Sequence, residues 1–106
     1  MKLIIAIVQD EDAAELSRAL IKKEIRATKL ATSGSFLKAG NTTFMIGIED
    51  QKVDEVIEII KTYSHKREQY LTPNMAMGSA MLNKSVEVTV GGATIFVLPV
   101  ESFIHF

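Results

Sequence analysis

The chain has 106 residues, of which 47% are hydrophobic and 24% are charged, and its formal net charge is −1. These values predict one globular domain over residues 1–106. They also predict no nucleic-acid partner, because neutralising phosphates needs a clustered excess of Lys and Arg and a net charge of −1 gives no long-range attraction for DNA or RNA. Cysteine is absent, which excludes disulfides, thiolate metal sites and a cysteine nucleophile and fits an intracellular protein.

The N-terminal apolar run, residues 3–8, is too short for a signal-peptide core or a membrane span. Because it is apolar on both alternating faces, we expect this run to be the central strand of a sheet. We also expect a cytoplasmic protein with no membrane partner. Residues 11–23 have apolar positions at helical spacing, with Asp10 as the predicted N-cap. The acidic run Asp10, Glu11 and Asp12 is interpreted as stabilising the dipole of this helix and not as a metal site.

The middle of the chain is predicted to form a hairpin and a second helix. Residues 26–32 alternate weakly, a turn rich in Gly, Ser and Thr follows, and residues 42–48 read as the partner strand. Asp50 is the predicted cap of the second helix. The apolar stripe of this helix consists of Val53, Val56, Ile57 and Ile60.

The last third of the chain is predicted to contain a long loop and a second hairpin. Residues 65–85 show no sustained period and are interpreted as a loop that has a function beyond connection. The stretch VEVTVGGATIFVLPV is interpreted as two strands joined by a tight turn at Gly91 and Gly92. Pro99 should end the pairing or lie on an edge.

These elements predict an α+β fold. Their order is that of a ferredoxin-like βαββαβ arrangement with one added C-terminal strand and a long loop before the last hairpin. Right-handed crossovers place both helices on one face of such a sheet, so its other apolar face needs a cover. We therefore expect a homo-oligomer, with closed symmetry favouring a dimer or a trimer.

The sequence offers little material for catalysis. The two histidines, His65 and His105, lie in no zinc-type spacing and beside no serine in a nucleophile-elbow motif. The stretch GSFLKAGNT lacks the Gly-Lys-Ser/Thr ending of a phosphate-binding loop. We expect no enzymatic activity, no metal site and no cofactor.

A nucleotide pocket is better supported by the residue types around the first hairpin. Phe36 and Leu37 offer an apolar surface for an adenine-like ring. Thr28 and Asn41 can form hydrogen bonds with the edge of such a ring, and Arg26 can contact a phosphate. These side chains would be close together if the two strands pair as predicted.

Two glycines extend this hypothesis, and a structural alternative stays open for each residue. Gly47 would let a base approach the backbone, and the backbone at Gly92 could approach a phosphate. Alternatively, Phe36 packs on a neighbouring subunit, Arg26 pairs with a surface acid, and Asn41 and Gly47 serve turn and bulge geometry. Spacing alone does not decide between these interpretations.

Three stretches of the chain resemble a known family. MKLIIAIVQD, RATKLATSGSFLKAGNTTF and VEVTVGGATIFVLPVESF are similar to the PII-like cyclic-di-AMP receptor proteins of the PstA or DarA type, over nearly the whole chain. The resemblance implies a cytoplasmic signal-transduction receptor that binds cyclic-di-AMP between the subunits of a homotrimer. It also implies ligand-dependent loop rearrangement, no enzymatic activity and an unidentified downstream protein partner.

The resemblance implies a pocket that contains the residues already chosen from their chemistry, namely Arg26, Thr28, Phe36, Leu37, Asn41 and Gly47. Ser35, Gly92 and His105 complete the expected ligand-binding set. Ser35 stands where the family commonly has Gly, Glu24 where Asn is frequent, and His105 where Gln is usual. A histidine can still donate or accept one hydrogen bond from the C-terminal tail.

Two other functions remain as alternatives. A PII-type protein binding ATP or ADP would need a basic run able to clamp a triphosphate, and HKREQYLTP supplies only a modest one. A structural trimer that docks a protein partner would use the Met-rich part of the long loop.

Overall fold

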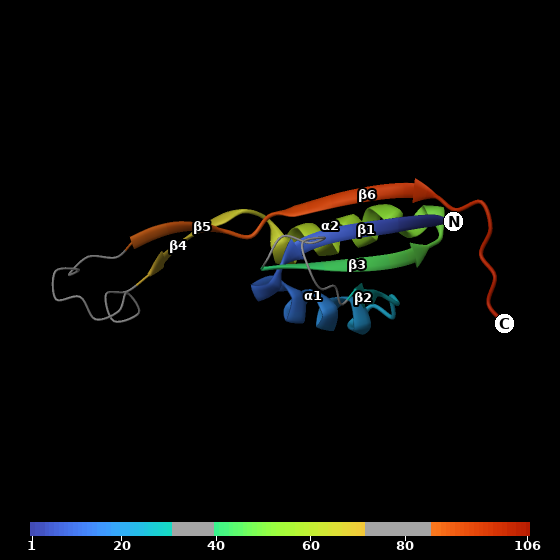
Figure 1. Ribbon diagram of the computed structural model, residues 1–106, viewed down its shortest axis with the longest axis horizontal. Coiled ribbons are helices and arrows are strands. Elements are labelled where there is room, and N and C mark those ends of the chain that lie inside the picture. Colours follow the sequence, from blue (N-terminus) through green and yellow to red (C-terminus); the bar gives the residue numbers. More distant parts are fainter. Residues whose placement is uncertain (31–39, 72–85) are drawn as a thin grey trace.

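The computed structural model of the chain describes residues 1–30, 40–71 and 86–106 (Figure 1). Three strands and one helix precede a short 3₁₀ turn at Asp50–Lys52, and a second helix and three strands follow it. The elements are β1 (Lys2–Gln9), α1 (Asp10–Lys22), β2 (Thr28–Leu30), β3 (Asn41–Ile48), α2 (Val53–Ser64), β4 (Arg67–Leu71), β5 (Val86–Val90) and β6 (Ala93–Pro99).

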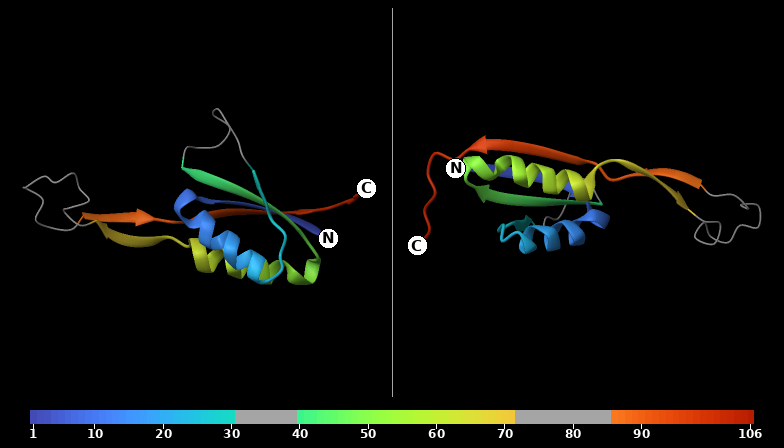
Figure 2. Two further views of the ribbon diagram at one scale, coloured as in Figure 1. Left: turned by 90° about the horizontal axis from the view of Figure 1, so that it is seen from below. Right: turned by 180° about the vertical axis from the view of Figure 1, so that it is seen from behind.

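Four strands form one antiparallel sheet in the order β2-β3-β1-β6. Both helices lie on the same face of this sheet, as the two views of Figure 2 show. This arrangement is compatible with the ferredoxin-like fold that the sequence predicts. The predicted hairpin of the second and third strands is confirmed, although its first strand begins at Thr28 and not at Arg26. These four strands and two helices are called the body below.

The core of the body lies between the sheet and the helices. In β1 the side chains of Ile4, Ala6 and Val8 are buried while their neighbours are half-buried, which is the alternation of a strand with one face under helices. The helices contribute buried apolar residues at helical spacing, namely Leu16, Leu20, Val56 and Ile60. The predicted stripe of the second helix is confirmed as core-facing at Val53, Val56 and Ile60, whereas Ile57 is only half-buried.

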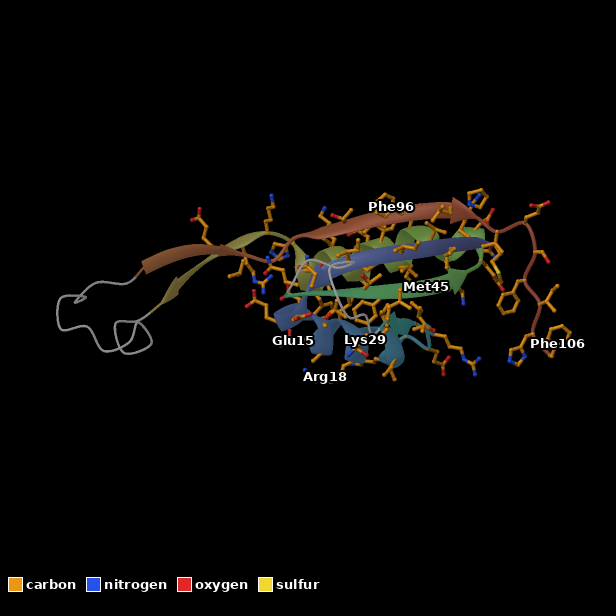
Figure 3. The ribbon with its side chains drawn as sticks, in the orientation of Figure 1. Glu15, Arg18, Lys29, Met45, Phe96 and Phe106 are labelled. Atoms are coloured by element: carbon orange, nitrogen blue, oxygen red, sulfur yellow. The ribbon has the colours of Figure 1, made fainter. Side chains whose placement is uncertain are left out.

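The opposite face of the sheet is apolar and partly open. Ile5 of β1 lies between Met45 of β3 and Phe96 of β6 in the cross-strand register. Ile5 and Met45 are half-buried, whereas the Phe96 side chain is 53% exposed (Figure 3). Leu98, in the next row of the same face, is 41% exposed. The expectation that apolar side chains reach both faces is confirmed.

Helix α1 ends in a left-handed residue that is not glycine. Glu24 has a φ of 60°. The amide of Ile25 donates to the carbonyl of Leu20, and the amide of Glu24 donates to the carbonyl of Ile21, both at 2.9 Å. With Leu20 and Ile25 both buried, this is a Schellman motif with its apolar contact. Asn and Gly adopt this φ more readily than Glu, so the departure at Glu24 has a conformational cost.

Strands β4 and β5 pair only with each other, and this two-stranded arm extends away from the body in Figure 1. The radius of gyration is 17.2 Å, whereas a compact domain of this length has about 13 Å. Two predictions are therefore wrong. Part of the long loop, Arg67–Leu71, is a strand, and Gly91 and Gly92 do not close a hairpin, because β5 pairs with β4 while β6 pairs with β1.

The predicted helix caps are also corrected. Asp10 is the first residue of α1, and its carboxylate accepts a hydrogen bond from the hydroxyl of Thr42, not from the helix. Asp50 begins the 3₁₀ turn, and its carboxylate pairs with the amine of Met1 at 2.8 Å. In both cases the carboxylate binds a group that is distant in sequence, and not the backbone amides of the helix that it was predicted to cap.

Candidate ligand-binding site

The hairpin of β2 and β3 holds part of the predicted pocket on the open face of the sheet. Thr28 lies opposite Met45, and Leu30 lies opposite Thr43. Cross-strand partners share a face, so Thr28 belongs to the same row as Ile5 and Phe96. The predicted residues Ser35, Phe36 and Leu37 lie outside the described residues.

Asn41 is fixed at one end of the sheet. It opens β3, lies opposite Gln9, and is half-buried. The preceding residue, Gly40, has a φ of 90°, and its carbonyl accepts a hydrogen bond of 2.8 Å from the amide of Asp10. Because Thr42 also contacts Asp10, Asn41 is held between two anchored neighbours.

Gly47 and Arg26 lie toward the other end of the sheet. Gly47 lies opposite Leu3 and is exposed, and a Cβ built on it would meet no atom within 4 Å. Packing within the chain therefore does not require glycine at this position, and the space beside it is free. Arg26 is exposed and lines a shallow groove together with Glu24, Ala27 and Thr28.

Gly92 and His105 lie at opposite ends of the body. Gly92 precedes β6 at the end where Asn41 lies, and its φ of 106° turns the chain between the two sheets. His105 is exposed in residues 100–106, which have no regular structure and leave the body at the end where Gly47 lies. The exposed side chain of Phe106, at the end of this tail, is labelled in Figure 3.

The described candidates thus form two groups in one chain. Asn41 and Gly92 lie at one end of the sheet, and Arg26, Thr28, Gly47 and His105 lie toward the other. Asn41 and Gly47 are separated by six residues of an extended strand, or about 20 Å. One copy of the chain does not bring all these residues into a single pocket.

The polar side chains of the candidates are available for a ligand. Within residues 1–30, 40–71 and 86–106, the side chains of Arg26, Thr28 and Asn41 form no hydrogen bond or ion pair. Pairing of Arg26 with a surface acid, one of the structural alternatives, is therefore not seen among these residues. Thr43, which the predicted set omits, is 4% exposed, and its hydroxyl has no partner in the described part of the chain.

The shorter of the two ion pairs found in the described residues lies at the base of the arm. Arg67 Nη2 is 2.6 Å from Oδ1 of Asp12, a carboxylate that is 4% exposed. The hydrogen bond to Asp12, reinforced by the charges of Glu11 and Glu15, raises the pKa of Arg67 above its ordinary value. Sequence reasoning missed this contact, because nothing in the spacing of residues 12 and 67 indicates that they meet.

The described residues contain neither a candidate metal site nor a candidate membrane-spanning helix. No group of three His, Cys, Asp or Glu side chains there could hold a metal ion. In the same part of the chain, no helix has the length and apolar character needed to cross a membrane.

Comparison with known proteins adds a family and a fold. The family model described as "Cyclic-di-AMP receptor" matches residues 1–106. A crystal structure titled as a functionally unknown protein from Pediococcus pentosaceus ATCC 25745 is 54% identical in sequence. The match covers 99% of this chain and 96% of that chain, with a TM-score of 0.80.

Proposed function

The chain belongs to the cyclic-di-AMP receptor family, and from this premise we propose that it binds cyclic-di-AMP and acts as a signal-transduction receptor, not as an enzyme. The proposed site is shared between neighbouring copies of a homotrimer. Its residues are Arg26, Thr28, Ser35, Phe36, Leu37, Asn41, Gly47, Gly92 and His105.

The observation that carries a shared site is the division of the candidates into two groups. A ligand that contacts both Asn41 and Gly47 would have to span about 20 Å of one strand, whereas a second copy can bring one group beside the other. The open sheet face with Phe96 and Leu98, and the exposed Phe103 and Ile104 of the tail, give such a copy apolar surface to bury. Closed symmetry then favours a ring of identical contacts.

Each available side chain has a chemical role in this proposal. The hydroxyl of Thr28 and the amide of Asn41 would form hydrogen bonds with the edge of adenine, and the guanidinium of Arg26 would contact a phosphate. At Gly47 the open space would admit a base against the backbone. The proposal assigns Phe36 to stacking on a base.

Binding of ATP or ADP is the weaker alternative. A triphosphate clamp would need free cations in the run HKREQYLTP, but Arg67 of that run is already paired with Asp12. Lys66, which is exposed, is the remaining Lys or Arg of that run. A structural trimer that docks a protein through the long loop is the other alternative, and titration with nucleotides separates all three.

The test is isothermal titration of the purified chain with cyclic-di-AMP, with cyclic-di-GMP and ATP as controls and the mass of the assembly measured on the same sample. We expect saturation near one cyclic-di-AMP per subunit of a trimer and little heat from either control. Gly47→Ala should lower the affinity about tenfold because its methyl group fills the space proposed for a base. No heat from cyclic-di-AMP well above micromolar concentration would refute the proposal.

A further inference from the structure

The base of the arm is held by several polar contacts, one of which is the hydrogen bond from the amide of Gly92 to the carbonyl of Ser64 at the end of α2. Arg67 donates to both carboxylate oxygens of Asp12, at 2.6 and 3.5 Å, and to the carbonyl of His65 at 3.1 Å. Next to the other strand, the amide of Gly91, the residue after β5, donates to Oε1 of Gln9 at 2.7 Å. The base of the arm therefore contacts residues 9–12, where β1 ends and α1 begins, from both of its sides.

These contacts leave no space for a side chain at Gly91. A Cβ on Gly91 would overlap the carbonyl oxygen of His65 and lie 2.6 Å from Nη1 of Arg67. The carboxylate of Asp12 is nearly inaccessible to water, so removal of its cation would leave a buried charge without compensation. The position of the arm is thus sensitive to the position of residues 9–12.

The same short segment holds the start of β3 on its other side. The amide of Asp10 donates to the carbonyl of Gly40, and the carboxylate of Asp10 accepts from the hydroxyl of Thr42. Asn41 lies between these two contacts. Side chains from residues 9–12 therefore alternate between the arm, at Gln9 and Asp12, and the proposed ligand site, at Asp10.

We propose that residues 9–12 couple the start of β3 to the arm, with Asp10 as the positioning residue for the ligand site and Gln9 and Asp12 as the positioning residues for the arm. The part of this inference that concerns the ligand rests on the proposed function. A ligand that shifts Asn41 would shift Asp10, and Asp12, two residues further along α1, would carry the shift to Arg67. By linkage, the arm would alter the affinity for the ligand by the same factor.

The coupling itself is tested without ligand, by amide hydrogen exchange of the full chain. Asp12→Asn removes the charge that binds Arg67, and Thr42→Val removes the hydroxyl that binds Asp10. We expect each substitution to speed exchange at the opposite side, at the Asp10 amide for Asp12→Asn and at the Gly91 amide for Thr42→Val, by about fivefold. Arg67→Gln removes the charge of the half-buried partner of the same ion pair, in case Asp12→Asn does not fold.

Two controls distinguish coupling from general loosening. Glu11→Gln removes the same charge in the same turn, but Glu11 is exposed and acts on Arg67 only through its charge, without a hydrogen bond or ion pair in the described residues, so the rates of both amides should change much less than in Asp12→Asn. The amides of Val56 and Ile60 in α2 serve as an internal reference. The coupling is refuted if each substitution affects only its own side, or if the α2 amides accelerate equally.

The link to the ligand is tested by repeating the exchange with saturating cyclic-di-AMP. In the wild type and in Glu11→Gln, the ligand should change the rates at Gly91 and Gly92, and in Asp12→Asn this change should be lost while heat of binding remains. If the wild type binds but its arm amides do not respond, the coupling to the ligand is wrong. If cyclic-di-AMP does not bind, the proposed function fails, and the ligand-free exchange still decides whether the two sides are coupled.

Discussion

The body and the arm are both built from antiparallel strands, but different forces hold them. The body has a core of hydrophobic side chains that are buried between its sheet and the two helices that cover one face of the sheet. The arm is a pair of strands that meets the body through Arg67, Gly91 and Gly92. An isolated two-stranded ribbon has little stability in water, so a few polar contacts decide where this one lies.

This difference predicts which substitutions should destabilise the whole domain and which should only detach the arm from the body. Loss of apolar volume in the body should lower the free energy of unfolding of the whole domain. Loss of a contact at the base of the arm should act mainly on local opening. Four predictions follow this contrast in order of decreasing effect.

The largest effect is expected in the core of the body. Leu16→Ala should lower the free energy of unfolding by about 3 kcal/mol, because a fully buried side chain is removed and a cavity remains. Ile21→Ala, on the same helix at a position 70% exposed, should change it by less than about 0.5 kcal/mol. Urea denaturation of the two variants measures both values, and equal losses would contradict the assigned core.

A smaller, local effect is expected at the base of the arm. Gly91→Ala places a methyl group against the carbonyl of His65 at a φ of 84°, which should cost about 1–2 kcal/mol. Hydrogen exchange should become faster in residues 67–71 and stay unchanged at Leu16 and Leu20. In the matched control, Gly47→Ala, the added methyl group meets nothing and exchange in the arm should not change.

The third prediction is a stabilisation within the body. Glu24→Gly relieves the left-handed backbone at the end of α1, and the free energy of unfolding should rise by about 0.5–1 kcal/mol. Asn, which also adopts this φ more readily than Glu, should give a smaller gain of the same sign. If urea denaturation shows that both variants are less stable than the wild type, the Glu24 side chain stabilises the fold by more than its left-handed backbone destabilises it.

The smallest effect concerns the ion pair of Asp50. The hydrogen bond from the Met1 amine, with the positive charges of that amine and Lys2, lowers the pKa of Asp50 below its ordinary value of 3.8. The folded-state pKa is the lower one, so the contribution is present above pH 3.8 and is lost as the pH falls through the folded-state pKa. Thermal melting of Asp50→Asn should therefore differ slightly from wild type at neutral pH and converge with it in acid. The pair is exposed, so added salt should reduce the difference.

The parts of the fold that could be predicted are those that bury a periodic apolar surface. The helices and strands β1 and β3 have apolar residues at helical or alternating spacing, and these residues are the ones that face the core. Strand β4 could not be found this way, since REQYL has no alternation of its own and is a strand through pairing with β5. The turn at Gly91 and Gly92 was misassigned because positive φ values suit a hairpin and a bend between sheets equally well.

The candidate site was predictable in its chemistry and not in its arrangement. Thr28, Asn41 and Arg26 were identified from the donors and acceptors they carry, and the structure leaves their side chains without partners in the described residues. Their division between two ends of a strand depends on cross-strand register, which no local pattern contains. The acidic run at residues 10–12 illustrates the same limit, because two of its carboxylates bind residues 32 and 55 positions away.

The sequence by itself determined which residues enter the core, where the helices lie and which family the chain resembles. These properties follow from local periodicity and composition, and each residue contributes to them independently of distant ones. Three features are visible only in the tertiary structure, namely the pairing of β5 with β4, the contacts of Asp10 and Asp12, and the separation of the ligand candidates. Such features depend on a few specific contacts between segments far apart in the chain, and those contacts exist only once the body has formed.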